Sequence, residues 1–306
     1  MSAIATGLAP VLVLILFGYG LKRSRFLPDA AWAGMEKLTY FVLFPALLVR
    51  SLANQHLLGT PWPSMLLVVT VTLLTAASVL ILWHRILPSV SGPTFTSIFQ
   101  GGVRFNTYIA LAVALSFFAA EGLALAAIAA GFMIILINLL CISVLGIWGT
   151  NPSKGIMAFS RNVIGNPLII SCAIGWFLSQ SGIGLPGITD NILEIVGRAA
   201  LPLGLLAVGA ALKPEAVRGH LKPIAISSLV QFGLKPVVAV LLISITGLSG
   251  IVAGVLVIVF MTPTAASAYI LARQLGGDTE TMASIITFQT LLAFLVMPLI
   301  ALVMLS

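Results

Sequence analysis

The sequence predicts an all-α polytopic membrane protein with ten transmembrane helices, and three observations lead to this prediction. Hydrophobic residues make up 60% of the 306 residues and charged residues only 8%, whereas about 25% of a typical soluble domain is charged. The mean hydropathy is +1.17. Apolar runs of membrane-spanning length follow one another along the chain, and lysine and arginine occur only in alternate connections between them. The formal net charge of +7 therefore reflects membrane topology, and we expect no nucleic-acid partner.

Ten apolar runs of roughly 17 to 28 residues are candidates for spanning helices. The first run has no basic residues before it and is long enough to cross a bilayer, so we interpret it as a membrane span and not as a cleaved signal. The runs lie near residues 3–21, 33–53, 62–83, 94–117, 122–149, 163–181, 190–212, 222–245, 250–273 and 280–305.

The positions of the basic residues test this topology. The even-numbered connections contain no lysine or arginine, and the odd-numbered connections contain them all along the chain. By the positive-inside rule, the odd-numbered connections face the cytoplasm and both termini lie outside it. The basic residues of the odd-numbered connections are Lys22, Arg23, Arg25, Arg85, Lys154, Arg161, Lys213, Arg218, Lys222 and Arg273.

The fourth run contains a segment that is unusual at membrane depth, from Gly101 to Tyr108. The two glycines Gly101 and Gly102 weaken a helix. Arg104 carries a permanent charge, and such residues usually face a protein interior or a water-filled cavity. Asn106 is a favoured residue for starting a helix. We predict that one helix ends at about Arg104 and that another begins at Asn106, because a break at this depth is tolerated only against a cavity or other protein.

The ninth run contains a second candidate break, Met261-Thr262-Pro263-Thr264-Ala265-Ala266-Ser267. Proline suits the first turn of a helix, and Thr262 before it can serve as the N-cap. We therefore predict a second half-helix that starts at Pro263. A simple proline kink is the alternative interpretation.

The ten runs divide into two halves, residues 1–150 and 151–306. A shift of 157 residues brings several positions of the first half into register with the second. Because each half has five spans, an odd number, the second half must be inverted relative to the first. The matched pairs are Pro10 with Pro167, Gly18 with Gly175, Pro45 with Pro202, Asn106 with Pro263, Thr107 with Thr264 and Glu121 with Asp278.

Two inverted broken helices would cross near the centre of the bilayer, where the second half of each points its N-terminal end. Such ends carry free N–H groups and about half a positive charge, so they attract anions. Arg104 adds a planar guanidinium suited to a carboxylate. The alternative is that Arg104 only neutralises the end of the first half-helix. The predicted substrate-binding residues are Arg104, Asn106, Thr107, Thr262, Pro263 and Thr264.

Short motifs in a fixed order resemble those of the auxin efflux carrier family, over nearly the whole chain. They are Arg104-Phe105-Asn106-Thr107-Tyr108, Asn166-Pro167, and Thr262-Pro263-Thr264-Ala265 followed by Leu271-Ala272. The chain is most similar to the bacterial members, which include malonate and other organic-acid permeases. It lacks the long cytoplasmic loop of the plant members, because its middle connection, residues 150–162, is short.

The resemblance implies ten helices in two inverted five-helix repeats with crossed helices 4 and 9, as in the bile-acid/sodium symporter and sodium/proton antiporter folds. It implies a scaffold of spans 1, 2, 6 and 7 that pairs two copies into a homodimer. Spans 3–5 and 8–10 would form a moving transport domain. The expected location is a bacterial inner membrane, and the expected partners are the lipid bilayer and a small carboxylate.

The sequence gives few candidates for residues that couple transport to an ion, because the acidic residues of the chain lie near the ends of the predicted spans. Lys235, with Gln231 one turn before it, is the candidate. Lys235 would bind and release a proton, stand as a fixed charge where relatives bind sodium, or extend to the membrane surface. The coupling ion, proton or sodium, stays open. We expect no cofactor and no metal site.

The predicted function is secondary active transport of a small organic anion by an elevator-type alternating access. An anion-conducting channel and a cation/proton antiporter on the same fold are the alternatives. An enzyme is not expected, because the three histidines are scattered and no nucleophile stands beside a base in any motif of the sequence.

Overall fold

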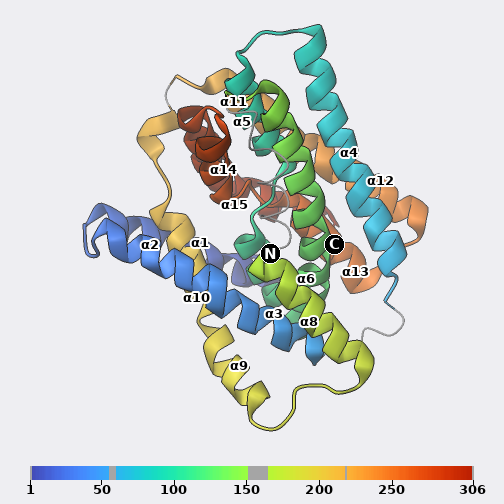
Figure 1. The fold of residues 1–306 in the computed structure, drawn as a ribbon. Helices are drawn as coiled ribbons and strands as arrows, with labels where there is room; N and C mark the ends of the chain where they lie inside the picture. Colours follow the sequence, from blue (N-terminus) through green and yellow to red (C-terminus); the bar gives the residue numbers. More distant parts are fainter. Residues whose placement is uncertain (1, 55–59, 151–164, 218, 305–306) are drawn as a thin grey trace.

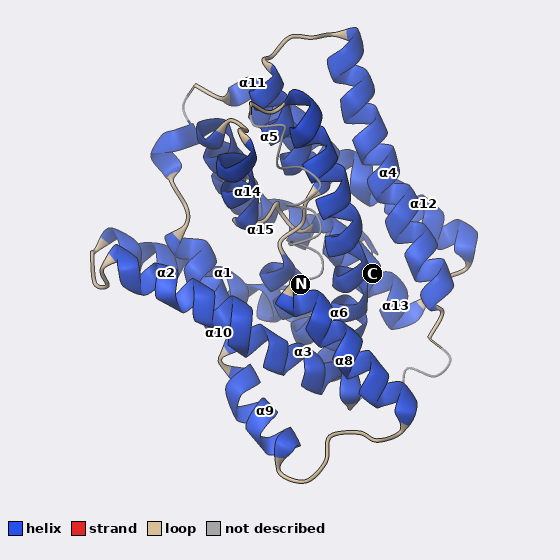
Figure 2. Cartoon of the chain, in the orientation of Figure 1, coloured by secondary structure: helices blue, strands red, loops and turns tan. Residues whose placement is uncertain are grey.

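The computed structural model describes residues 2–54, 60–150, 165–217 and 219–304, and these residues form helices and connecting loops without a strand (Figure 1, Figure 2). Helices fall in each of the ten predicted runs. The basic residues Lys154, Arg161 and Arg218 of the topology prediction lie outside the described residues. The helices are α1 (Ser2–Arg23), α2 (Asp29–Leu38), η1 (Thr39–Leu43), α3 (Phe44–Ala53), α4 (Trp62–Ile86), α5 (Gly92–Val103), α6 (Thr107–Trp148), α8 (Pro167–Ser181), α9 (Thr189–Arg198), α10 (Ala200–Ala210), η3 (Pro214–Val217), α11 (Leu221–Leu229), η4 (Val230–Leu234), α12 (Lys235–Thr246), α13 (Gly250–Met261), α14 (Ser267–Leu275) and α15 (Thr279–Met304).

Six helical stretches of the described residues are long and apolar enough to cross a membrane, which makes the chain a multi-pass membrane protein. One of them, Gly92–Trp148, has 57 residues, far more than the roughly 20 that one crossing needs. Its backbone leaves the helical region at Phe118 and at Ala119, where φ is 50° and ψ is −147°. A Cβ on Gly92 would lie 2.6 Å from the carbonyl oxygen of Trp148. The two ends of this stretch therefore meet, so the chain reverses direction between them.

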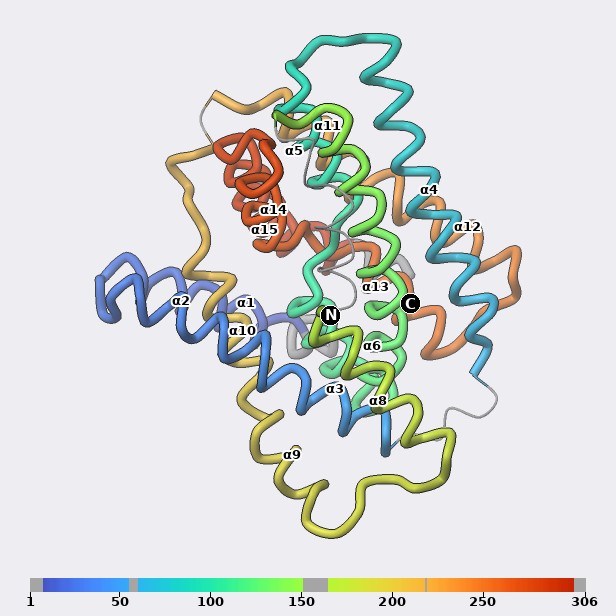
Figure 3. Tube along the Cα trace, in the orientation of Figure 1, coloured from blue at the N-terminus to red at the C-terminus, as the bar shows by residue number. Residues whose placement is uncertain are grey.

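The helices gather in two groups (Figure 1, Figure 3). The blue and yellow helices α1, α2, α3, α8, α9 and α10 form the lower group of the picture. The cyan, green and orange-red helices α4, α5, α11, α12, α13, α14 and α15 form the upper group, and α6 joins the two. Within the upper group, α5 and α13 lie at the centre: every residue of the segments 95–103 and 254–261 is buried.

Glycines allow very close helix crossings in the lower group. A Cβ on Gly18 of α1 would lie 2.2 Å from the carbonyl oxygen of Leu206 in α10. A Cβ on Gly175 of α8 would lie 2.9 Å from the carbonyl oxygen of Val49 in α3. Any side chain at either glycine would force the helices apart. The shift of 157 residues relates Gly18 to Gly175 and Val49 to Leu206, so the two contacts are counterparts.

The odd-numbered connections lie close to one another. The backbone N–H of Asp278 donates to the Pro93 carbonyl at 3.2 Å, and that of Thr150 donates to the Gly276 carbonyl at 3.0 Å. Arg23 lies 4.0 Å from Glu215. The first connection therefore meets the seventh, and the third, fifth and ninth meet one another.

Asp278 also caps the start of α15, because its carboxylate accepts from the backbone N–H of Thr281. Burial alone would raise the pKa of its carboxyl group, but hydrogen bonds from Thr281 and Thr94 outweigh burial and lower it.

Both predicted helix breaks are present, and one starting position was wrong. The first helix ends at Val103 and the next starts at Thr107, with Asn106 as its N-cap, as predicted. The second break runs from Thr262 to Ala266, and α14 begins at Ser267 instead of at Pro263. Thr262 ends α13, where its hydroxyl donates to the Val259 carbonyl. The preference of proline for a first turn is overridden because the backbone of this segment bonds to side chains of other helices.

Candidate functional site

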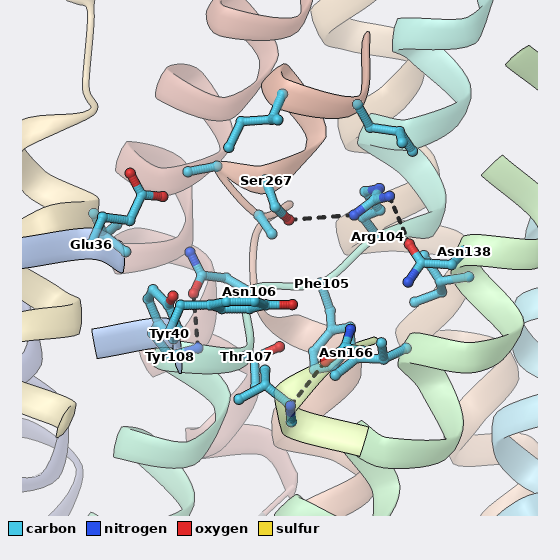
Figure 4. Close-up of a pocket in the computed structure, with 18 of the residues that line it drawn as sticks. Glu36, Tyr40, Arg104, Phe105, Asn106, Thr107, Tyr108, Asn138, Asn166 and Ser267 are labelled. Carbon is cyan, nitrogen blue, oxygen red and sulfur yellow. Dashed lines mark hydrogen bonds between the residues drawn. The ribbon is translucent and has the colours of Figure 1, made fainter. Parts of the chain in front are cut away.

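A cavity of about 420 Å³ lies between the two groups of helices. The lower group contributes residues of α2, η1 and α8 to its wall, and the upper group contributes the first break and the start of α14 (Figure 4). Its polar and charged lining residues are Glu36, Lys37, Tyr40, Arg104, Asn106, Thr107, Tyr108, Asn138, Asn166, Ser267 and Gln274. The cavity is large enough for a small organic molecule.

Arg104 supplies a buried positive charge to this cavity, with only 8% of its surface exposed. One guanidinium nitrogen donates to the amide oxygen of Asn138 at 3.0 Å, and another reaches the Ser267 hydroxyl at 3.4 Å. The Nε atom has no hydrogen-bond partner. Among the described residues, no carboxylate lies within ion-pair distance of Arg104. The side chain is therefore oriented by neutral groups while its charge stays unpaired.

Two helix N-termini border the same cavity. Asn106 accepts hydrogen bonds from the backbone N–H groups of Tyr108 at 3.0 Å and Ile109 at 3.2 Å, which fixes the start of α6. Thr107, the first residue of α6, and Ser267, the first residue of α14, both line the cavity. The positive ends of two helices and one guanidinium thus converge on one space, an arrangement that favours an anion.

The first part of the second break, residues 262–264, faces protein, whereas Ala265 and Ala266 line the cavity. Thr262 and Thr264 are fully buried, and neither they nor Pro263 line the cavity. The Thr264 hydroxyl donates to the Gln100 carbonyl at 3.3 Å, and its backbone N–H donates to Gln289 at 3.0 Å. Thr262 and Thr264 therefore bond to the protein around the crossing of the broken helices. Of the predicted binding residues, Arg104, Asn106 and Thr107 line the cavity.

Lys235 and Gln231 bond to the two broken helices where these cross, and they do not line the cavity. The Lys235 ammonium donates to the carbonyls of Val103 and Arg104, both at 3.2 Å, and to the side-chain oxygen of Gln231 at 2.7 Å. Gln231 also donates to the Thr262 carbonyl. Lys235 is fully buried, so the alternative in which it extends to the membrane surface is wrong. It caps the free carbonyls at the end of α5, the role that Arg104 had in one interpretation of the sequence.

Known proteins of similar sequence are membrane transporters. A family model described as membrane transport protein matches residues 3–125 and 152–301. The chain belongs to this family, the auxin efflux carriers. This auxin efflux carrier family member is also similar to an uncharacterized transporter from Methanothermobacter thermautotrophicus, with 24% identity over 295 residues that cover 94% of each chain. Both matches are to membrane transporters and not to enzymes.

The structure adds site residues of this family member that the sequence did not single out. Asn138 and Ser267 hold Arg104, but they lie 34 and 163 residues from it in the chain, so no local pattern connects them. Glu36 was expected near the end of a span and yet lines the cavity. Asn166 caps α8 in the way that Asn106 caps α6. Asn166 lies inside the sixth predicted run, and the proline after it is the local signal for this helix start. No group of three His, Cys, Asp or Glu side chains in the described residues is arranged to hold a metal ion.

Proposed function

We propose that this protein is a secondary transporter of a small organic anion that works by alternating access. The observation that carries the proposal is the unpaired charge of Arg104 on the cavity wall. A buried charge without a partner costs several kcal/mol. A carboxylate bound in the cavity would supply the missing partner, and two aligned N–H···O bonds would orient it. The free N–H groups at the starts of α6 and α14 would stabilise the same negative charge.

Ten membrane crossings in two inverted repeats fit the structural observations. The stretch Gly92–Trp148 supplies two crossings because the chain reverses within it. The counterpart contacts at Gly18 and Gly175 are what a two-fold relation between halves would produce. The clustering of the odd-numbered, basic connections supports one cytoplasmic face. In this proposal both termini are extracytoplasmic, in a bacterial inner membrane.

The two groups of helices would be the two bodies of an elevator. The lower group, α1–α3 and α8–α10, would be the scaffold, locked by its glycine crossings and pairing with a second copy. The upper group, with α4 to α6 and α11 to α15, would carry the anion across as the transport domain. The cavity lies where these two bodies meet, so sliding of one past the other would move Arg104 relative to the scaffold residues.

Lys235 favours an anion carrier over a cation/proton antiporter. Its ammonium group already supplies a cation to the carbonyl oxygens at the helix crossing. A sodium ion would need the same oxygen ligands. We therefore propose that Lys235 is a fixed internal charge, with Gln231 holding it in position.

Counterflow into proteoliposomes tests the proposed function. Vesicles that contain the purified protein are loaded with an unlabelled small carboxylate and given the labelled one outside. A carrier predicts saturable uptake that unlabelled anion on the far side accelerates. Uptake that is linear with concentration and insensitive to far-side anion would show a channel and contradict the proposal.

A disulfide between the two bodies tests the elevator motion. A Cβ on Gly131 of α6 would lie 3.6 Å from the Cβ of Cys172 in α8, a separation that suits a disulfide. Oxidation of Gly131→Cys should abolish counterflow, and reduction should restore it. The same substitution in a Cys172→Ser background should be insensitive to oxidation. Full flux through the cross-linked protein would rule out sliding at this contact.

A further inference from the structure

Glu36 places a carboxylate in the same cavity as Arg104. It is the one acidic side chain among the described residues that line the cavity. Figure 4 shows it on the opposite side of the view from Arg104, with Ser267 between them. The residue is partly buried, and its carboxylate has no hydrogen-bond or ion-pair partner within the described part of the chain. A carboxylate that has no partner in a ligand cavity can change its protonation state when a charged ligand binds.

The surroundings of Glu36 do not hold it in the ionised form. The neighbouring Lys37 is exposed, so water screens its charge. Tyr40 in η1 and Tyr108 in α6 are neutral at physiological pH. α14 contributes the uncharged Gln274 to the lining, and α10, which packs on α2, contributes only Val208. Arg104 is the remaining charged group of the cavity, and the substrate anion would engage it.

An anion on Arg104 changes the balance of charge for Glu36. In the empty cavity the charges of Arg104 and an ionised Glu36 sum to zero. A bound carboxylate would add a second negative charge to a space of about 420 Å³. Two carboxylates that share one poorly solvated site favour the state in which one of them keeps a proton. Protonation of Glu36 would return the loaded cavity to zero charge.

We propose that Glu36 is a proton-binding site that controls loading of the cavity, so that each anion binds together with one proton. This inference rests on the proposed function, because it takes an anion at Arg104 as given. Glu36 lies on α2, in the proposed scaffold, and so it stays behind when the transport domain moves. The proton therefore regulates binding at the scaffold and does not travel with the anion. Acidification of the solution that reaches the cavity increases loading.

The test is a calorimetric titration of the full-length protein in detergent with two probes, propionate and ethanesulfonate, over about pH 5 to pH 8. Ethanesulfonate keeps its charge over this range, so any pH dependence belongs to the protein. For the wild type we expect the affinity to fall about tenfold for each pH unit above the pKa of Glu36, with about one proton taken up per anion bound. Titrations in buffers of different ionisation heat measure that proton.

Two variants separate Glu36 from its neighbour. Glu36→Gln should bind both probes at all pH values with the wild-type affinity measured at low pH, and without proton uptake. Lys37→Gln is the matched control, and it should keep the pH dependence.

Wild-type binding that does not change with pH would overturn the inference while leaving the proposed function intact. Loss of binding in Glu36→Gln would overturn it as well, because a neutral side chain at this position would then fail to support anion binding. A wild-type protein that binds neither anion at any pH would contradict the proposed function, and the inference with it.

Discussion

The two broken helices look alike in sequence and differ in what they face. At the first break, Arg104 and Asn106 line the cavity, and the guanidinium charge has no partner. At the second break, Thr262 and Thr264 are fully buried and bonded to protein. One side chain joins the two breaks, since Gln289 donates to the Gly101 carbonyl at 3.0 Å and accepts from the Thr264 N–H.

The difference shows that an interrupted helix at membrane depth can serve two purposes. Free backbone groups at such a break must be satisfied, and the second break satisfies them with side chains from neighbouring helices. The first break leaves its positively charged side open to the cavity. In the proposed mechanism, the first break binds the anion and the second supports the first. The following substitutions would break or sharpen this contrast.

The largest contrast is expected between Asn106→Ala and Pro263→Ala, which occupy matched positions of the two breaks. Asn106→Ala removes the acceptor of two backbone N–H groups and releases the start of α6, at a cost of about 1 kcal/mol in stability. We expect counterflow to fall at least about a hundredfold, because the displaced N-terminus no longer meets the anion. Pro263→Ala should keep flux within about fivefold. Similar losses in both variants would show that the two breaks share one role.

Gln289→Leu should weaken both breaks together. The substitution leaves the Gly101 carbonyl and the Thr264 N–H buried without partners, at about 1 to 3 kcal/mol each. We expect a clear decrease of the melting temperature in detergent. Gln274→Leu, on the exposed side of the cavity, is the matched control and should melt with the wild type. An unchanged melting temperature in Gln289→Leu would mean that the crossing does not depend on this bridge.

Asn138→Ala tests the orientation of Arg104 and should have a smaller effect. The lost hydrogen bond, 3.0 Å long, involves a charged group, so about 1.5 kcal/mol and roughly a tenfold weaker anion affinity are expected. Ser267→Ala removes a longer contact of 3.4 Å and should weaken binding only about twofold. A larger effect at Ser267 than at Asn138 would show that the hydroxyl contacts the anion directly.

The sequence was sufficient for features that depend on neighbouring residues. The end of α5 and the N-cap at Asn106 were predictable because the glycines, the arginine and the asparagine lie within six residues of one another. The start of α14 was not, because the backbone from Thr262 to Thr264 bonds to Gln231 and Gln289 from other helices. Local proline preference carries no information about such distant partners.

The candidate site was predictable only in part for the same reason. Arg104, Asn106 and Thr107 were found because a charge and a cap are unusual within an apolar run. Their partner Asn138 comes from a uniformly apolar stretch of α6, where one amide has no local signal. Glu36 was expected near the end of a span, and only the three-dimensional structure shows that it lines the same cavity as Arg104.

The most direct test of the central claim, that an anion binds at the unpaired charge of Arg104, is a titration of the purified protein with small carboxylates. Arg104→Ala is compared with Arg85→Ala, which removes an exposed arginine at the end of α4. We predict a loss of anion affinity of at least about a hundredfold for Arg104→Ala, because a buried charge pair is removed, and a change within about twofold for Arg85→Ala. Equal and small changes in the two variants would contradict the assignment of the anion to the first break.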